Sequence, residues 1–379
     1  MNILVAPNAL KGSLDPFEAA RAIAEGLARG LPGVHAECLP IADGGDATAA
    51  VLVDALHGSF AEAPVSDPLG RPIAARFGLF GDGGEAVIEM AASSGLALLA
   101  TNERDPMVAT TYGAGELVRV ALDRGARRIL VALGGSATVD GGAGFVEALG
   151  ARLLDAQGKP VRRGGAGLAA IARIDVTGLD PRLRDVELVA LCDVDNGLLG
   201  EQGAAKTFGP QKGATPEMVK QLEAGLAHWS DAIARDLGRD VAALKHGGAA
   251  GGMGAGIAGI LGGKLESGAD WILARIDVKR RLAGQDVAIT AEGHIDPQTL
   301  GNKAPYALAR AARAAGVPVV AFAGGIADKV DTATFDLFNV IVPICPRPMP
   351  LDEAMARARE LLTASAERTG RLLALVQRR

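Results

Sequence analysis

Residues 129–154 read ILVALGGSATVDGGAGFVEALGARLL and change character twice within one short stretch. The apolar run at the start predicts a buried strand, and FVEALGARLL at the end predicts a helix. Between them, residues 134–144 contain five glycines, which let a backbone approach a ligand closely. A strand, a glycine-rich turn and a helix N-terminus together place several N–H groups around an anion, typically a phosphate.

The same segment supplies side chains that suit a phosphate-handling loop. Ser136 and Thr138 carry hydroxyl groups, and Asp140 can cap the helix that follows. We therefore expect Gly134, Gly135, Ser136 and Thr138 to bind substrate or phosphate. The segment lacks the Gly-Lys-Ser/Thr ending of a Walker A loop, so any cation must come from elsewhere in the chain.

Length and composition set the class of protein. With 379 residues the chain exceeds one typical compact core, which makes two domains the prior expectation. A hydrophobic content of 49% with 22% charged residues indicates a soluble, folded protein. The net charge of −5, the lack of a basic stripe and an aromatic content of 3% argue against nucleic acid as a partner.

The three cysteines, Cys38, Cys192 and Cys345, are widely spaced, and no pair has metal-ligand spacing. Reduced thiols in a cytoplasm are the plain interpretation. The N-terminal MNILV has no basic n-region, and no stretch approaches the roughly 20 uninterrupted apolar residues of a membrane span. We expect a cytoplasmic protein without membrane contact, present as a monomer or a homodimer.

Strand-like and helix-like segments alternate at both ends of the chain. Residues 3–6 predict a strand, and a helix follows it from Asp15 as cap, with Pro16 in its first turn. Residues 287–290 and the run VPVVAFAGG predict two more strands, separated by the helix ALARAARAAG. Such alternation argues for a parallel sheet with covering helices.

The middle of the chain has a different rhythm. From about Ala63, short strand-like segments joined by turn residues are more consistent with hairpins than with crossovers. Trp229 lies in a stripe with helical spacing, so we predict that it belongs to the core. The simplest organisation is a doubly wound α/β domain made from residues 1–65 and 285–379, with a second α/β domain, residues 66–284, inserted.

Acidic residues repeatedly stand just past a predicted strand end: Asp43, the pair Asp193 and Asp195, and Glu292 with Asp296. Open α/β sheets bind ligands at the carboxyl ends of their strands, and carboxylates there can hold Mg²⁺. For any single one of them a turn or helix cap is the more common role, but the shared position favours function for the set. Asp193 and Asp195 share one face of an extended segment and are our candidate metal ligands.

Lysines also lie in loops near the glycine-rich segments. Phosphoryl transfer needs cations around the moving group, whereas a lone loop lysine is by default a solvated side chain. Lys11 departs from that default because it sits in a strand-to-helix loop, where a ligand would lie, and Lys212 in FGPQKGA is the second candidate. Ser94, after EMAA, either caps a helix, which is the safer interpretation, or binds a small polar substrate.

Residues 254–259 match GxGxxG, but no convincing strand precedes them, so we reject a dinucleotide fingerprint. A close-packed Gly/Ala helix is at least as good an interpretation. No histidine pair has zinc spacing, and no GxSxG elbow appears. The residues therefore support a two-domain α/β enzyme that handles a phosphorylated ligand with Mg²⁺, and they do not identify the acceptor.

A set of motifs adds a resemblance to a known family. The chain resembles the type I glycerate kinases, whose members transfer the γ-phosphoryl group of ATP to D-glycerate, in many bacterial cases at the 2-hydroxyl. The resemblance also implies a flavodoxin-like domain formed by both chain ends. The matching segments run in order over almost the whole chain: APNALKGSL (6–14), PIADGGDAT (40–48), EMAASSGL (89–96), ATTYGAGEL (109–117), GGSATVDGGAG (134–144), CDVDNGLLG (192–200), FGPQKGA (208–214), GGMGAG (251–256) and TAEGHID (290–296).

Several positions depart from the usual family pattern: Asn8 and Ala9 replace an acid and a hydroxyl residue, Asp46 a glutamate, Val139 an asparagine, Gly197 a proline and His294 an arginine. Asn8 and Asp46 keep polarity or charge, so we expect activity to survive. His294 is the most consequential departure, because a neutral imidazole cannot replace a permanent cation at a phosphate.

The resemblance and the residues together suggest a mechanism. We expect Mg·ATP and D-glycerate to meet in a cleft between the domains, where Asp193 or Asp195 orients Mg²⁺ or accepts the hydroxyl proton. Lys11 and Lys212 would neutralise phosphate or the substrate carboxylate. Asp43 and Glu292 would form further walls of the substrate site, and the sequence leaves open which loop holds the nucleotide. A kinase of another small hydroxy acid and a non-catalytic nucleotide- or acid-binding protein remain alternatives.

Overall fold

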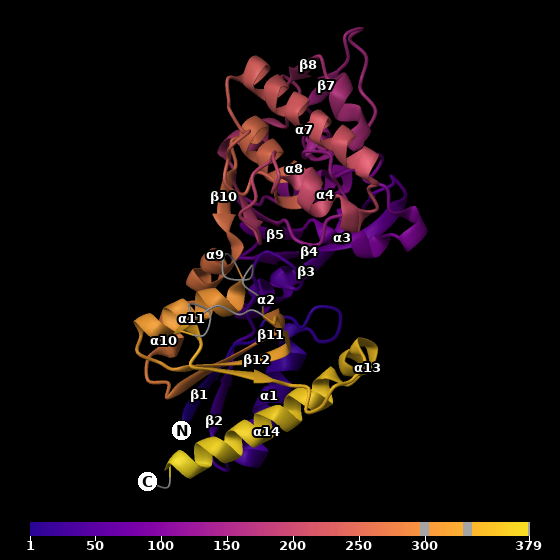
Figure 1. The fold of residues 1–379 in the computed structure, drawn as a ribbon. Helices are drawn as coiled ribbons and strands as arrows, with labels where there is room; N and C mark the ends of the chain where they lie inside the picture. Colours follow the sequence, from indigo (N-terminus) through magenta and orange to yellow (C-terminus); the bar gives the residue numbers. More distant parts are fainter. Residues whose placement is uncertain (296–302, 329–335, 378–379) are drawn as a thin grey trace. The chain divides into compact units, whose positions relative to one another are not determined.

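The structure is a computed structural model that describes residues 1–295, 303–328 and 336–377 (Figure 1). The chain forms two compact units. The terminal unit comprises Met1–Asp43 and Ala269–Arg379, and the inserted unit comprises Gly44–Gly268. Asp296, one of the acidic residues singled out in the sequence, lies outside the described residues.

The terminal unit is built on a parallel sheet, which within the described residues has the strand order β13-β12-β11-β1-β2. In order of appearance along this unit, the strands run 2-1-3-4-5, the order of flavodoxin-like sheets, so the topological switch point lies between β1 and β11. The strands are β1 (Asn2–Val5), β2 (His35–Cys38), β11 (Val287–Ile295), β12 (Val319–Ile326) and β13 (Val340–Pro343).

Two long helices cover one face of this sheet. Helices α1 and α14 lie side by side in Figure 1 and bury Ile3 and Val5 of β1 in a shared core. Asp15 caps α1 as predicted, because its side chain accepts the N–H of Glu18 at 2.8 Å. The helices described in this unit include α1 (Pro16–Gly30), α9 (Gly268–Arg275), α10 (Val278–Leu282), α11 (Ala304–Ala314), α13 (Leu351–Ala356) and α14 (Ala358–Gln377).

The inserted unit has a mixed sheet with the order β10-β9-β6-β5-β4-β3 among the described strands. The hairpins predicted in the middle of the chain are confirmed, because β4 pairs antiparallel with both β3 and β5. The other pairs are parallel. The strands are β3 (Ser59–Ser66), β4 (Pro72–Phe80), β5 (Glu85–Glu89), β6 (Arg128–Ala132), β9 (Glu187–Cys192) and β10 (Lys264–Ser267), with β7 (Arg152–Leu154) and β8 (Arg173–Asp175) as a separate antiparallel pair.

Helices pack around this mixed sheet, and Trp229 on the longest of them is fully buried, as its helical stripe predicted. The segment that matches GxGxxG lies in α8 and the helical turn after it, buried against the rest of the unit rather than following a strand. The helices are α2 (Thr48–Ala55), α3 (Ala91–Ser94), α4 (Tyr112–Asp123), α5 (Ala143–Ala148), α6 (Ala204–Phe208), α7 (Pro216–Leu237) and α8 (Ala249–Gly256).

The two units meet along the chain at positions that differ from the boundaries predicted after residues 65 and 284. Residues 44–65 belong to the inserted unit because α2 packs on β4, and β3 pairs with β4 along its whole length. Helix α10 belongs to the terminal unit, where Arg281 Nη1 lies 2.6 Å from Glu37 Oε1 on β2. No low-complexity linker marks these crossings in the sequence.

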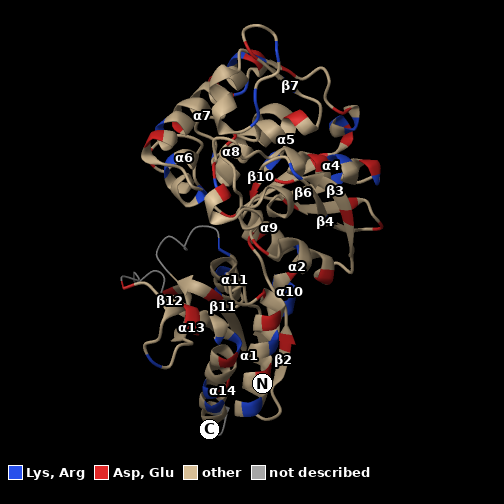
Figure 2. Ribbon diagram, turned by 90° about the vertical axis from the view of Figure 1, so that its right-hand side faces the viewer, with Lys and Arg blue, Asp and Glu red and all other residues tan. Residues whose placement is uncertain are grey.

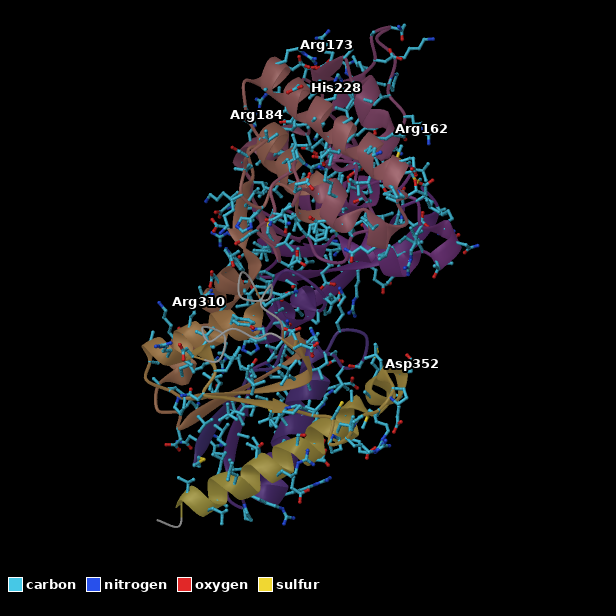
Figure 3. All side chains as sticks on the ribbon, viewed as in Figure 1. Arg162, Arg173, Arg184, His228, Arg310 and Asp352 are labelled. Carbon is cyan, nitrogen blue, oxygen red and sulfur yellow. The ribbon has the colours of Figure 1, made fainter. Side chains whose placement is uncertain are left out.

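Acidic and basic side chains are interspersed along the helices of each unit (Figure 2). Pairs such as Arg310 on α11 with Asp270, at 2.9 Å, are exposed and contribute little to stability (Figure 3). Among the helices that the structure describes, none is both long and apolar enough to cross a lipid bilayer.

The close approach of α1 to α14 depends on Gly26. A β-carbon at this position would lie 2.2 Å from the backbone oxygen of Thr363, and backbone cannot yield as a flexible side chain would. We expect Gly26→Ala to lower the free energy of unfolding by about 1–3 kcal/mol, measured by chemical denaturation. Ala28→Ser, at an exposed position of the same helix, is the control. An unchanged midpoint in Gly26→Ala would contradict this packing.

Candidate functional site

Two acids and an amide gather at the switch point of the terminal sheet. Asn8 follows β1, Asp43 follows β2, and all three side chains, including Glu292 on β11, are buried. The Asn8 Nδ2 donates to Asp43 Oδ2 and to Glu292 Oε2, each at 3.2 Å. Lys303 Nζ lies 3.6 Å from Asp43 Oδ2. The structure thus brings together two of the acids singled out in the sequence.

Glu292 lies within β11 and not past its end, which corrects the expectation from the sequence. The strand continues beyond Glu292 because it pairs with β12 as far as Ile295 opposite Ile326. Burial, and then the negative charge of Asp43, raise the pKa of Glu292 to about 7, while Lys303 and the amide of Asn8 act in the opposite direction. A carboxyl group with such a pKa can accept or release a proton near neutral pH.

The glycine-rich segment 134–144 of the inserted unit joins β6 to α5, and part of it is used for packing. The N–H of Gly134 donates to the carbonyl of Gly44 at 2.9 Å. A β-carbon at Gly134 would lie 2.4 Å from the Cα of Gly45, so only glycine fits against this neighbouring turn. The carbonyl of Gly135 accepts the N–H of Leu96 at 2.9 Å. The backbone at these two glycines therefore holds neighbouring loops as well as shaping the segment.

Lys212 supplies the cation that the segment itself lacks. Its ammonium group is buried and donates to Ser136 Oγ at 2.6 Å and to the carbonyl of Thr138 at 2.7 Å. Burial lowers the pKa of Lys212 to about 7, against the opposing charges of Asp140 and Asp193. A lysine in this state gains its charge most readily when an anion comes close.

Two buried hydroxyl groups lie at the glycine-rich segment. Across the described part of the chain, Ser94 Oγ and Thr138 Oγ1 have no hydrogen-bond partner, although both side chains are fully buried. Ser94 lies against the segment, because its carbonyl accepts the N–H of Ala137 at 2.9 Å. Buried polar atoms without partners are uncommon in folded proteins.

The side chain of Asp140 holds the glycine-rich segment in place by hydrogen bonds. Its fully buried carboxylate accepts the N–H and the hydroxyl of Thr111, at 2.8 and 2.9 Å, and the N–H groups of Gly142 and Gly144, at 3.1 and 3.3 Å. The last two donors lie at the start of α5, which agrees with the predicted capping role. Burial raises the pKa of Asp140, and these hydrogen bonds oppose that effect.

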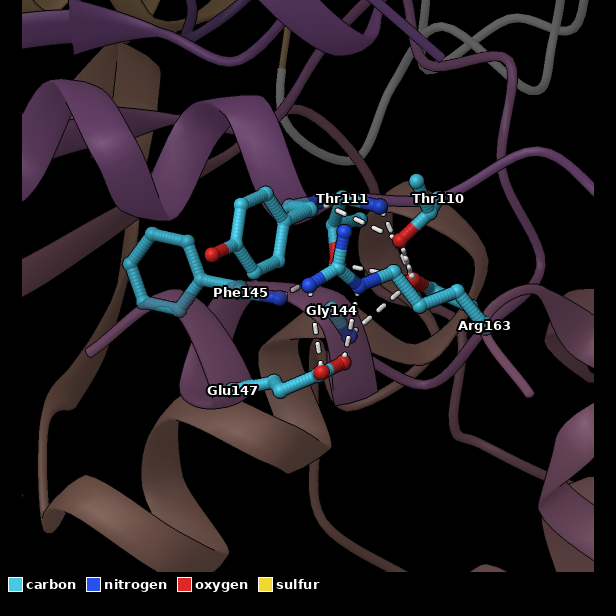
Figure 4. A network of polar contacts seen from close by, with 8 residues as sticks. Thr110, Thr111, Gly144, Phe145, Glu147 and Arg163 are labelled. Carbon is cyan, nitrogen blue, oxygen red and sulfur yellow. Dashed lines mark hydrogen bonds and ion pairs between the residues drawn. The ribbon is translucent and has the colours of Figure 1, made fainter. Parts of the chain in front are cut away.

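Arg163 lies beside this network and contacts two helices, at Tyr112 on α4 and Glu147 on α5. Its guanidinium lies 3.4 Å from the centre of the Tyr112 ring and forms two hydrogen bonds to Glu147, at 3.0 and 3.1 Å (Figure 4). A paired and stacked arginine of this kind fixes the helix that follows the glycine-rich segment.

Asp193 and Asp195 follow β9 as predicted, and they have different surroundings. Asp195 Oδ1 lies 3.3 Å from both Lys245 Nζ and His246 Nδ1, whereas Asp193 is close enough to Lys212 to affect its pKa. Within the described ranges no three histidine, cysteine, aspartate or glutamate side chains gather around one point. One or two carboxylates fit Mg²⁺, which commonly takes its remaining ligands from water and substrate phosphates.

The predicted site residues therefore fall into two groups, one on each unit. Ser94, Gly134, Gly135, Ser136, Thr138 and Lys212 gather in the inserted unit, with Asp193 close by. In the terminal unit, Asp43 and Glu292 share Asn8, and Lys11 lines a cavity together with Glu292.

Sequence reasoning assigned no site role to Thr111 or Lys303 and placed Trp229 only in the core. The indole N–H of Trp229 also donates to the carbonyl of Gly141 at 2.9 Å. Thr111 lies within ATTYGAGEL, one of the segments that carry the family resemblance, and Lys303 lies within GNKAP.

Comparison with known proteins adds the family. A model of the glycerate kinase family matches residues 3–374. The chain belongs to the glycerate kinase family. It is 44% identical to the glycerate kinase of Bacillus subtilis (strain 168), over 99% of this chain and 97% of that protein. It is 39% identical to the glycerate 2-kinase of Escherichia coli (strain K12), over 100% and 99% of the two chains.

A solved structure agrees with this assignment. The crystal structure of a protein from Salmonella typhimurium LT2, provisionally named glycerate kinase 2, matches with a TM-score of 0.85 and 41% identity, and the match covers 100% of both chains. The family shown by the comparisons is the one that the sequence motifs resemble, and the two-part α/β fold is the one expected.

The raised pKa of Glu292 has a consequence for stability. The pKa of Glu292 in the folded protein lies above the ordinary value of 4.5, so the folded state binds this proton more tightly than the unfolded state does. The stability gained in this way is lost as pH rises through about 7. Glu292→Gln is neutral at every pH and does not lose this stability. We therefore expect the melting temperature of the variant minus that of the wild type to be higher at pH 8 than at pH 5, by the equivalent of about 2 kcal/mol. Glu217→Gln, at an exposed position, is the control, and a pH-independent difference in Glu292→Gln would contradict the assignment.

The network of Asp140 predicts a second effect. Asp140→Asn replaces one carboxylate oxygen, which accepts hydrogen bonds, by an NH₂ group, which donates them. The groups that donate to that oxygen would then face another donor, so we expect the free energy of unfolding to fall by about 2–5 kcal/mol. Hydrogen exchange should increase first in residues 134–144. Asp231→Asn, exposed on α7, serves as the matched control. Unchanged exchange in that segment would show that Asp140 does not hold it.

Proposed function

We propose that this chain transfers the γ-phosphoryl group of ATP to the 2-hydroxyl of D-glycerate. The observation that carries the proposal is the position of Lys212, whose buried ammonium group donates to Ser136 and Thr138 of the glycine-rich segment, in a member of the glycerate kinase family. The choice of the 2-hydroxyl is supported by the relative that is named glycerate 2-kinase.

The reaction needs little covalent work from the protein. The substrate hydroxyl attacks the γ-phosphorus, the bond from that phosphorus to the bridging oxygen of ADP breaks, and the hydroxyl proton passes to a base. Lys212, Ser136 and Thr138 would bind anionic oxygens. Lys11, Lys303 and the acids Asp43 and Glu292 would line a ligand site on the terminal unit. We place the reaction in the cytoplasm, in a monomer or a homodimer.

Magnesium belongs to the proposal through Asp193 and Asp195, whose oxygens suit it together with phosphate oxygens. When bound, the ion would neutralise phosphate charge. Asp193 is also our candidate for the group that accepts the hydroxyl proton, because it lies near Lys212. Asp195, which contacts Lys245 and His246, would instead serve in orientation.

One assay tests both the activity and the position of phosphorylation. Purified protein with ATP, Mg²⁺ and D-glycerate should release ADP, and enolase added without a phosphoglycerate mutase should consume the product at once. ADP release without the enolase signal would indicate transfer to the 3-hydroxyl. A panel of other hydroxy acids would reveal a different substrate, and thermal stabilisation by ligands without ADP release would indicate a non-catalytic binding protein.

Replacing the candidate base gives a sharper test. Asp193→Asn keeps the size of the side chain and removes its negative charge, so we expect kcat to fall by about 100-fold or more while the melting temperature changes little. Asp185→Asn, at an exposed position of the same unit, should leave kcat unchanged. Turnover of Asp193→Asn near the wild-type rate would exclude this residue from the chemistry.

A further inference from the structure

The terminal unit contains a cavity of about 520 Å³ whose use the proposed reaction does not yet explain. It lies along the carboxyl ends of the parallel strands: Leu10 follows β1, Glu292 lies on β11 and Ile344 follows β13. The cavity therefore borders the switch point between β1 and β11. Sheets of this topology bind their ligands at that place.

The residues that line the cavity are of two kinds, apolar and polar. Leu10, Ile344, Leu351, Ala354 and Met355 form an apolar part. Leu351, Ala354 and Met355 come from α13, the short helix on which Figure 3 labels Asp352. Met355 reaches the loop after β1, because a β-carbon at Gly12 would lie 2.9 Å from its terminal methyl group.

The polar part of the cavity carries Lys11, Lys303, His294 and Glu292. The two lysines in this lining suit phosphate oxygens, while the apolar residues suit a flat ring system. Glycerate cannot account for such a site, since it is small and carries a polar group on every carbon. Burying it against leucine and methionine would cost free energy rather than gain it.

We propose that this cavity binds the adenine and ribose of ATP, with the phosphates directed toward Lys11 and Lys303. The inference rests on the proposed function, which supplies a nucleotide as phosphoryl donor, and it assigns nucleotide recognition to the terminal unit. It also gives His294 a role. Its ring lies against β12 where Gly325 leaves room, since a β-carbon there would stand 2.7 Å from the imidazole Nδ1. A flat wall for a base does not need the permanent charge of an arginine.

Filling the apolar part tests the assignment. Ala354→Trp places an indole in the space claimed for the base, so we expect the KM for ATP to rise about tenfold or more. The KM for D-glycerate should stay within about twofold. Ala356→Trp, exposed on the same helix, is the matched control and should leave both values unchanged. A folded Ala354→Trp variant with an unchanged KM for ATP, or with the KM for glycerate raised instead, would overturn the proposal.

A second measurement does not depend on turnover. Cys345 lines the cavity and is partly exposed, Cys38 is exposed and Cys192 is buried. In a Cys38→Ser background, we expect saturating ADP to slow alkylation of Cys345 by about fivefold or more. D-glycerate should have no such effect, and Cys345→Ser identifies the labelled site.

The outcomes separate the two proposals. Protection of Cys345 by ADP in a protein that does not phosphorylate glycerate would support the nucleotide cavity and defeat the proposed function. Turnover of glycerate, with calorimetric binding of ADP but no protection of Cys345, would overturn the cavity and leave the function standing. Failure of ADP to bind at all would overturn both.

Discussion

The two hydrogen bonds from the Lys212 ammonium to residues 136 and 138 are the constraint on which the candidate phosphate site depends. They join positions 76 and 74 residues apart and hold a charge-bearing group away from water. Burial disfavours the charged form of Lys212, and the negative charges of Asp140 and Asp193 only partly offset this effect. A phosphate near Lys212 would offset the remaining cost of burying the charged form, because an added negative charge raises the pKa of a lysine. Anion binding and protonation of Lys212 are therefore linked.

In the acid cluster of the terminal unit, burial again favours the neutral form of a side chain. For Glu292 this raises the pKa, whereas for Lys212 it lowers the pKa. Asp43 and Glu292 are two buried carboxyl groups that repel each other when both are ionised. Asn8, which stands where the family usually has an acid, donates to both and so adds attraction without a third negative charge. Even so, the pKa of Glu292 stays near 7. The departure at Asn8 thus makes the pair easier to keep buried, and it leaves one carboxyl group that titrates under physiological conditions.

Local patterns in the sequence predicted those elements whose formation depends on residues close to them in the chain. The cap at Asp15, the hairpins around β4 and the buried strand before the glycine-rich segment follow from nearby residues alone. The extension of β11 past Glu292 was missed because it depends on pairing with β12. The contact between Lys212 and the segment was named only as a possibility, and Thr111 was missed, because both depend on long-range packing. Motifs predicted which segments carry the candidate site, whereas long-range packing determines which of their atoms come into contact.

The two ligands of a glycerate kinase make opposite demands on a protein. A small hydroxy acid and a phosphoryl group need donors and cations in fixed positions, as the segment around Lys212 provides through hydrogen bonds. A nucleoside needs apolar surface, which the terminal unit offers between α13 and the strand ends. His294 belongs to the second environment, where shape matters more than charge. If the cavity binds a nucleoside as proposed, this position would not require the permanent charge of an arginine.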